Sequence, residues 1–361
     1  MQVREIKIRE LLDFIKSEEY QKLDIKPITE LRAVSQFHNP DAAPDDLALI
    51  YAVNNNELLG FAGLLPKKIN GENTKVYSNT CWWANQQKGK GIAVPLFLQL
   101  LKRADNKLFL AESTPRAKTI LEKTGLFGKI NQHEGIRGFI RFYSASIIQK
   151  NYSDKKWLAI PFFFLDFILN VVFLPFKYFF LSKFKKGSFN IEEISEVDET
   201  LEKFIQEYSS RDFIQKTANH FNWFKNYPWL KLKGSKNSIQ YPFTCVAEKF
   251  ELGYFVLKQV NDIKAFVAIS NHDNLAKIPF LFFDKKYLKE VVYSIMVLII
   301  ERQYDSVVIF QPEIVEFMEK NKMPFYFRKT EIKYSGTTKP IEDIFNQKPL
   351  MQDGDGDAVF I

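Results

Sequence analysis

A segment that joins a predicted strand to a predicted helix through two glycines constrains the fold of this chain most. A strand is expected near residues 74–83, after the turn at Asn70-Gly71, and residues 92–104 are apolar at helical spacing. Between them lies Asn85-Gln86-Gln87-Lys88-Gly89-Lys90-Gly91. Glycines let backbone amides approach a ligand closely, and a helix start adds free N–H donors. The segment therefore predicts an α/β fold with a backbone cradle for a pyrophosphate group.

The spacing of these glycines separates the segment from other phosphate-binding loops. It is neither Gly-x-Gly-x-x-Gly nor a P-loop, which argues against dinucleotide and P-loop nucleotide sites. Lys88 and Lys90 add positive charge beside the amides. The alternative is a plain tight turn between a strand and a helix that binds nothing.

Strand and helix patterns alternate twice along the chain. The first series contains a hairpin turn at 54–57, a strand over 107–111, a helix over 115–124 and a closing strand over 138–143. The second contains a hairpin formed by 243–249 and 253–260, a strand over 264–270 and a long helix over 287–302. We therefore expect an α/β (α+β) fold of two domains, each a mixed sheet flanked by helices. The predicted boundaries are 1–145, a linker over 146–188, and 189–361.

The linker contains Trp157–Leu181, the most apolar part of the chain, with lysines on both sides. Its length could span a bilayer. Pro161 and Pro175 should break a helix, however, and Asp166, Asn170 and Lys177 would be costly in lipid. Three interpretations stay open: a buried interdomain connection, an interfacial membrane helix or hairpin, and a true span.

Charge and composition limit the partners. The formal charge of +7 favours anionic partners, although a lysine-rich composition alone would also produce it. Cys81 and Cys245 are too few for a disulfide framework, and the four histidines show no metal spacing. We expect a reducing compartment, no export signal and no metal. The acidic tail 353–357 lacks most of a calcium loop, so we expect an exposed turn there.

Two motifs resemble one known family. Lys88-Gly89-Lys90-Gly91-Ile92-Ala93 is similar to the acyl-CoA loop of the GNAT superfamily of N-acyltransferases. Ala117–Leu126 is similar to the later helix of that superfamily. The order of elements in the second half resembles that of tandem, two-half bacterial members. The resemblance implies two GNAT-like domains, with acetyl-CoA or another acyl-CoA bound by the first and a degenerate second domain.

The resemblance also implies roles by position. The pyrophosphate would bind amides of the loop, the pantetheine arm would pair with backbone groups on the preceding strand, and Thr114 stands where the family often has Asn. The amine would attack the thioester directly, without a covalent enzyme intermediate. The implied cofactor-binding residues are Trp82, Trp83, Lys88, Gly89, Lys90, Gly91, Ile92, Ala93 and Thr114.

The acid–base residues are less defined. Leu121 replaces the Tyr that often protonates the leaving thiolate in the family, so the acid must come from elsewhere or be water. Glu112 and His38 are candidates for the general base. A capping or ion-paired carboxylate and an ordinary loop histidine are the competing explanations. Cys81 has no adjacent histidine to support a nucleophile, so we interpret it as a core residue.

The second half lacks a glycine loop. The corresponding segment 283–289 offers no glycine, and Asp284 would repel a phosphate. This half is expected to bind no acyl-CoA and to shape an acceptor cleft. Its segment 219–224 resembles a Trp-containing helix of tandem GNAT-like proteins of glycan biosynthesis, although an aromatic stripe is more often core.

Three functions follow from these observations. The first is acetyl transfer to an amine, on an amino sugar or sugar nucleotide for surface polysaccharide, at the cytoplasmic side and on the inner face of the membrane if the apolar segment contacts it. A lipid-linked amine acceptor belongs to the same hypothesis. The alternatives are a Fem-type aminoacyl transferase that uses aminoacyl-tRNA and a non-catalytic membrane-associated binding protein. Nucleic acid is not expected, because the chain lacks zinc spacing and a basic recognition helix.

Overall fold

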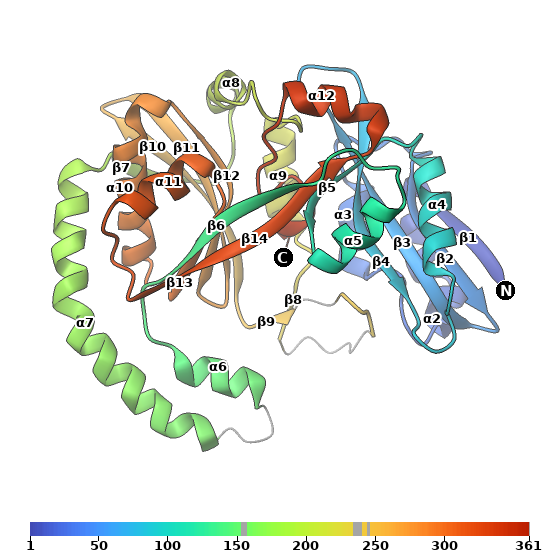
Figure 1. Ribbon diagram of the computed structural model, residues 1–361, viewed down its shortest axis with the longest axis horizontal. Helices are drawn as coiled ribbons and strands as arrows, with labels where there is room; N and C mark the ends of the chain where they lie inside the picture. The colour runs from blue at the N-terminus through green and yellow to red at the C-terminus, as the bar shows by residue number, and fades with distance from the viewer. Residues whose placement is uncertain (153–156, 234–239, 244–245, 361) are drawn as a thin grey trace. The chain divides into compact units, whose positions relative to one another are not determined.

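The computed structural model describes residues 1–152, 157–233, 240–243 and 246–360 (Figure 1). Cys245, Lys155 and Lys156 lie outside the described residues. The chain forms two compact units, which interleave along the sequence. Unit 1 comprises 1–133, 196–252 and 333–361, and unit 2 comprises 134–195 and 253–332. This division differs from the consecutive domains expected from the sequence, which were 1–145 and 189–361 with a linker over 146–188.

The sheet of unit 1 is mixed. Its strands lie in the order β1, β2, β3, β4, β5 and the end of β14, and only β4 and β5 are parallel neighbours. The strands of the unit are β1 (Gln2–Lys7), β2 (Leu47–Asn54), β3 (Glu57–Lys68), β4 (Lys75–Ala84), β5 (Leu108–Ser113), β8 (Lys231–Leu232) and β9 (Val246–Ala247), with part of β14 (Phe327–Thr337).

Helices cover both faces of this sheet. Alternation along β2 sends Ile50 and Ala52 to one face and Tyr51 and Val53 to the other. The first face packs against α4 and α5, and the second against α1, α2 and α3. The helices of the unit are α1 (Leu11–Lys16), α2 (Glu18–Lys22), α3 (Glu30–Phe37), α4 (Ala93–Arg103), α5 (Pro115–Lys123), α8 (Glu199–Tyr208), α9 (Ala218–Asn226) and α12 (Glu342–Gln347).

Unit 2 is built around a second mixed sheet in the order β6, β13, β12, β11, β10, β7. The long helix α10 is almost entirely buried against this sheet. The elements of the unit are β6 (Asn131–Phe139), α6 (Ser144–Asn151), α7 (Ile160–Gly187), β7 (Asn190–Ile194), β10 (Phe250–Gln259), β11 (Asp262–His272), β12 (Leu275–Phe283), α10 (Leu288–Glu301), β13 (Ser306–Ile309) and α11 (Pro312–Lys320). The fold is thus the mixed α/β class expected from the sequence.

Helix α7 differs from the expected linker. It packs within unit 2, where it contacts α6 and α10 (Figure 1). Only 11% of its most apolar window is buried. Pro161 lies in the first turn, where a missing N–H costs nothing, and the helix continues through Pro175. The predicted break was wrong: the helix runs without interruption from Ile160 to Gly187, and its inward-facing side packs against α6 and α10 on both sides of Pro175.

Three other expectations need correction. The hairpin in unit 2 is formed by β10 and β11, because Val260 and its neighbours make the turn; the predicted partner strand 243–249 includes the undescribed residues 244–245. Strand β12 was not predicted at all. The acidic tail is buried in unit 1 rather than exposed. Asp353 pairs with Lys333 at 2.9 Å and Asp355 with Lys216 at 2.7 Å.

Candidate functional site

Strands β4 and β5 separate in the middle of unit 1. Their parallel pairing covers only Tyr77–Leu108 and Ser78–Phe109. Just beyond this point Thr80 is an extra residue on β4, because Gly63 pairs with Cys81 and Leu64 with Asn79. A bulge of this kind bends and twists its strand. Within the described part of the chain, the edge of β4 facing β5 has no strand partner after Ser78.

The two-glycine segment continues from this unpaired end of β4 into α4. Gly89 is buried, and a Cβ atom there would lie 2.1 Å from the carbonyl oxygen of Leu59. Gly91 has φ +85° and open space around its Cα atom. The indole Nε1 of Trp82 donates to the carbonyl of Ala93 at 2.8 Å, which ties the strand to the first turn of the helix. Glycine is therefore required at both positions, for different reasons.

The backbone amides of the turn fall into two groups. The turn itself uses those of Gln87, Lys88, Gly89 and Ile92: Asn85 Oδ1 accepts from Gln87 and Lys88, Asn85 O accepts from Gly89, and Gly89 O accepts from Ile92. Among the hydrogen bonds of the described residues, none has the amide of Lys90, Gly91, Ala93 or Val94 as its donor. Four donors are thus available at the exposed start of α4, where the helix dipole favours an anion.

This geometry reduces the number of backbone amides that can donate hydrogen bonds to a pyrophosphate. The whole run 88–93 was assigned to the pyrophosphate, but three of its six amides are occupied within the turn. The side chain of Lys88 forms an ion pair with Glu57 at 2.5 Å. Trp82 and Trp83, which were predicted to pair with the pantetheine arm, lie opposite Ala62 and Phe61 of β3. Their other edge faces the gap beside β5.

The remaining predicted residues lie apart from the turn. Thr114 caps α5, since its hydroxyl accepts from the amide of Ala117 at 3.2 Å. Glu112 is exposed on β5, and His38 is exposed at the end of α3 and stacked on Tyr227 with ring centroids 4.6 Å apart. Leu121 is buried in the core, so this position of α5 supplies no acid. No contact between described residues brings Glu112 and His38 together.

Cys81 and the aromatic helix are core, as expected. Cys81 is 7% exposed and packs with Tyr51 and Phe61, and burial raises the pKa of its thiol above the usual range. A neutral buried thiol is a poor nucleophile. In α9, Trp223 is buried and donates to the carbonyl of Ser35 at 2.7 Å. His220 is buried against Asp41 at 2.8 Å.

The tail contributes to this region in a way that sequence reasoning missed. A Cβ atom on Gly356 would lie 3.0 Å from Ala111 Cβ and 3.8 Å from Ser78 Oγ. The tail therefore crosses the sheet at the point where β4 and β5 part. Its alternating Asp and Gly residues were the only signal, and they do not show which lysines will pair with the carboxylates. Among the described residues, no group of three or more His, Cys, Asp or Glu is placed to hold a metal.

The equivalent segment of unit 2 has a different construction. Strand β12 leads to α10 through a short 3-10 turn over Lys285–Tyr287. The carboxylate of Asp284 accepts from the amide of Lys286 at 3.1 Å, and an ion pair joins the same two side chains at 2.6 Å. A chain carboxylate thus occupies the place that an anionic ligand would take. Of these two described segments, the turn of unit 1 is the one that combines two glycines with unused amides.

Comparisons with known proteins reveal likenesses in fold. No family model matches the chain, and none of the curated proteins matches its sequence. A GCN5-related N-acetyltransferase from Anabaena variabilis is similar in structure, with 7% identity, a TM-score of 0.48, and coverage of 93% of this chain and 72% of that one. N-myristoyltransferase of Saccharomyces cerevisiae with bound myristoyl-CoA has 9% identity, a TM-score of 0.48, and coverage of 93% and 78%.

A protein from Enterococcus faecalis described as a probable N-acyltransferase is similar to the same degree. It has 9% identity, a TM-score of 0.49, and coverage of 93% of this chain and 72% of that one. Likenesses with TM-scores below 0.5 carry no argument about activity. The function proposed below therefore depends on the residues of the turn and of its strand.

Proposed function

We propose that the chain is an acyl-CoA-dependent N-acyltransferase that binds one acyl-CoA at the two-glycine turn of unit 1. The observation that carries the proposal is the set of unused amides at Lys90, Gly91, Ala93 and Val94, beside a strand edge without a partner. Amides at a helix start suit a diphosphate. An unpaired strand edge suits the two amides of a pantetheine arm, which can pair with it as another strand would.

The acceptor is proposed to be a small-molecule or lipid-linked amine. Acetyl-CoA is the proposed donor, and an amino sugar or sugar nucleotide of surface polysaccharide the proposed acceptor, at the cytoplasmic side of a membrane contacted through 157–181. The exposed apolar face of α7 supports the membrane contact. The occupied segment at Asp284 supports a single cofactor site in the chain, with unit 2 free to shape the acceptor.

Gly91→Glu tests the cofactor site. The new carboxylate would occupy the anion position, so acetyl-CoA affinity measured by calorimetry should fall at least tenfold. Gly125→Glu is the matched control, because Gly125 also has positive φ (+68°) and open space around it. Both variants carry the same backbone strain, about 1–2 kcal/mol. Equal affinity of the two variants for acetyl-CoA would reject the site.

Glu112 and His38 are proposed as alternative general bases. Replacing the true base by Gln should lower kcat about 10²- to 10⁴-fold and leave acetyl-CoA affinity unchanged. The variants Glu112→Gln and His38→Gln are each assayed with acetyl-CoA and a panel of amines, and thermal stability is measured in parallel. If both variants keep full kcat, another group or a water molecule is the base.

A further inference from the structure

In the apolar part of helix α7, the charged and amide side chains lie on the inner side. Residues at steps of three and four, from Phe162 to Phe184, form the stripe that faces the rest of unit 2. Asp166 belongs to this stripe, is 7% exposed, and accepts from the amide of Ala145 at 2.8 Å. Asn170 bonds both backbone groups of Phe142, at 3.0 and 2.8 Å. Asp166 and Asn170, two of the three residues that would be costly in lipid, therefore face the protein and hydrogen-bond to its backbone, and the third, Lys177, lies half-buried on the same stripe.

The outward face of α7 is apolar for about two thirds of its length. Asp166 is the only acidic residue of the helix, and it points inward. The most exposed side chains of this face are Phe164 (68%), Phe167 (68%), Val172 (72%), Tyr178 (61%) and Phe179 (66%). A helix in contact with water normally has the opposite arrangement, with its polar side outward. A continuous exposed apolar face marks a site of contact with a membrane or with another protein.

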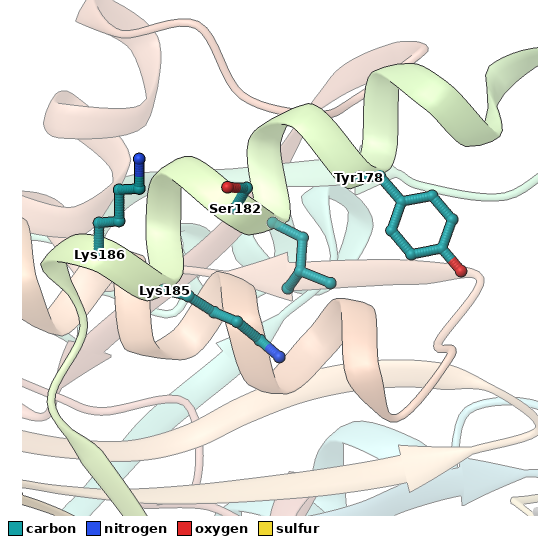
Figure 2. A pocket seen from close by; sticks show the side chains of 5 residues that line it. Tyr178, Ser182, Lys185 and Lys186 are labelled. Atoms are coloured by element: carbon teal, nitrogen blue, oxygen red, sulfur yellow. The ribbon is translucent and has the colours of Figure 1, made fainter.

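The same face becomes basic at its C-terminal end. A shallow depression on α7 is lined by Tyr178, Leu181, Ser182, Lys185 and Lys186. Figure 2 shows how the side chains of Tyr178, Ser182, Lys185 and Lys186 project from the helix. Lys185 forms an ion pair with Glu301 at 2.6 Å. Among the described residues, no carboxylate lies within ion-pair distance of Lys183 or Lys186. Ammonium and hydroxyl donors next to apolar surface fit the phosphate headgroups of an anionic bilayer.

We propose that α7 lies in the plane of an anionic membrane, with its outward face in the acyl region and its lysines at the headgroups. By length and composition alone the helix could also cross a bilayer, so its contacts decide between the two arrangements. A crossing would also carry α6, α10 and the backbone of Phe142 into the hydrocarbon, because the inward stripe contacts them. This inference deepens the proposed membrane contact, and it is tested without acyl-CoA, so it fails or holds independently of the transferase activity.

Vesicle flotation tests the membrane contact. The full chain should float with vesicles of phosphatidylcholine and phosphatidylglycerol, and weakly or not at all with phosphatidylcholine alone. Val172→Asp should lower the partition coefficient about tenfold or more. Val260→Asp is the matched control, since Val260 is 87% exposed in a turn of the same unit, and it should float like the wild type. The double variant Lys183→Glu, Lys186→Glu should remove the preference for anionic lipid.

Fluorophores at defined positions distinguish a helix in the plane from a span. Phe164→Cys, Val171→Cys and Tyr178→Cys are each introduced separately into a Cys245→Ser chain. The new cysteine carries a fluorophore, and lipids brominated at known depths quench its fluorescence. A helix in the plane gives one shallow depth for all three labels, whereas a span separates successive labels by about 10 Å. Three results would overturn the proposal. The first is a graded series of depths for the three fluorophores, and the second is equal flotation of the Val172→Asp variant and the wild type. The third is a wild-type protein that binds no vesicles and forms a dimer that the Val172→Asp substitution dissociates.

Discussion

Lys67 shows how far the interior of unit 1 departs from an apolar core. It lies on β3 and is 1% exposed, with Nζ 4.9 Å from the ring centroids of both Trp223 and Phe224. Burial lowers the pKa of its ammonium from 10.5 to about 8, and the charge of Asp41 opposes this shift. The cation is therefore stabilised by aromatic faces and by carboxylates at longer range. Such a group makes stability depend on pH.

We predict that Lys67→Met abolishes a rise in stability between pH 8 and pH 10. In this window the unfolded lysine still binds its proton while the folded one releases it, so the free energy of unfolding of the wild type gains about 2 kcal/mol. Below pH 8 the cost of burying the charge is fully present. Denaturant unfolding of both proteins at several pH values measures the difference. Lys68→Met is the control, and parallel curves for the wild type and Lys67→Met would contradict the assignment.

Single residues could be predicted from the sequence where local chemistry decides them. The strand–turn–helix pattern singled out Gly89 and Gly91 for close approach to a phosphate. The structure adds that Gly89 approaches the carbonyl of Leu59 and that Gly91 has positive φ. The split between used and unused amides could not be predicted, because Asn85 decides it by accepting two of them. Glu112 and His38 remain predictions, since each was chosen from position alone.

At the scale of elements, turn residues predicted hairpins better than apolar runs did. Asn55 and Asn56 have φ 48° and 65°, as a tight hairpin between β2 and β3 requires. Asp273 and Asn274 have similar angles and connect β11 to β12, so the missed strand had a recognisable signal. Helix α7 was predicted to break at its prolines, but Pro161 lies in the first turn and the helix continues through Pro175.

At the scale of the whole molecule, long-range pairing lies beyond local patterns. The end of β14 pairs with β5 in unit 1, and β6 pairs with β13 in unit 2, so each sheet takes a strand from the other half of the sequence. No local periodicity encodes such an exchange. Residues 196–252 and the tail likewise join unit 1. The fold class could be predicted because strand and helix patterns are local, and the boundaries could not.

The two units differ in the feature on which the proposed function depends. The turn of unit 1 exposes unused amides, whereas Asp284 occupies the corresponding position of unit 2. One acyl-CoA per chain is therefore expected. Hydrogen exchange of backbone amides reports on both segments in one experiment, because amides that bind a phosphate exchange more slowly than free ones.

The most direct measurement is amide hydrogen exchange of the full chain with and without saturating acetyl-CoA. The account predicts slower exchange at Lys90, Gly91, Ala93 and Val94, and no change over 284–290. Unchanged exchange at these four amides, or equal protection of both segments, would contradict it.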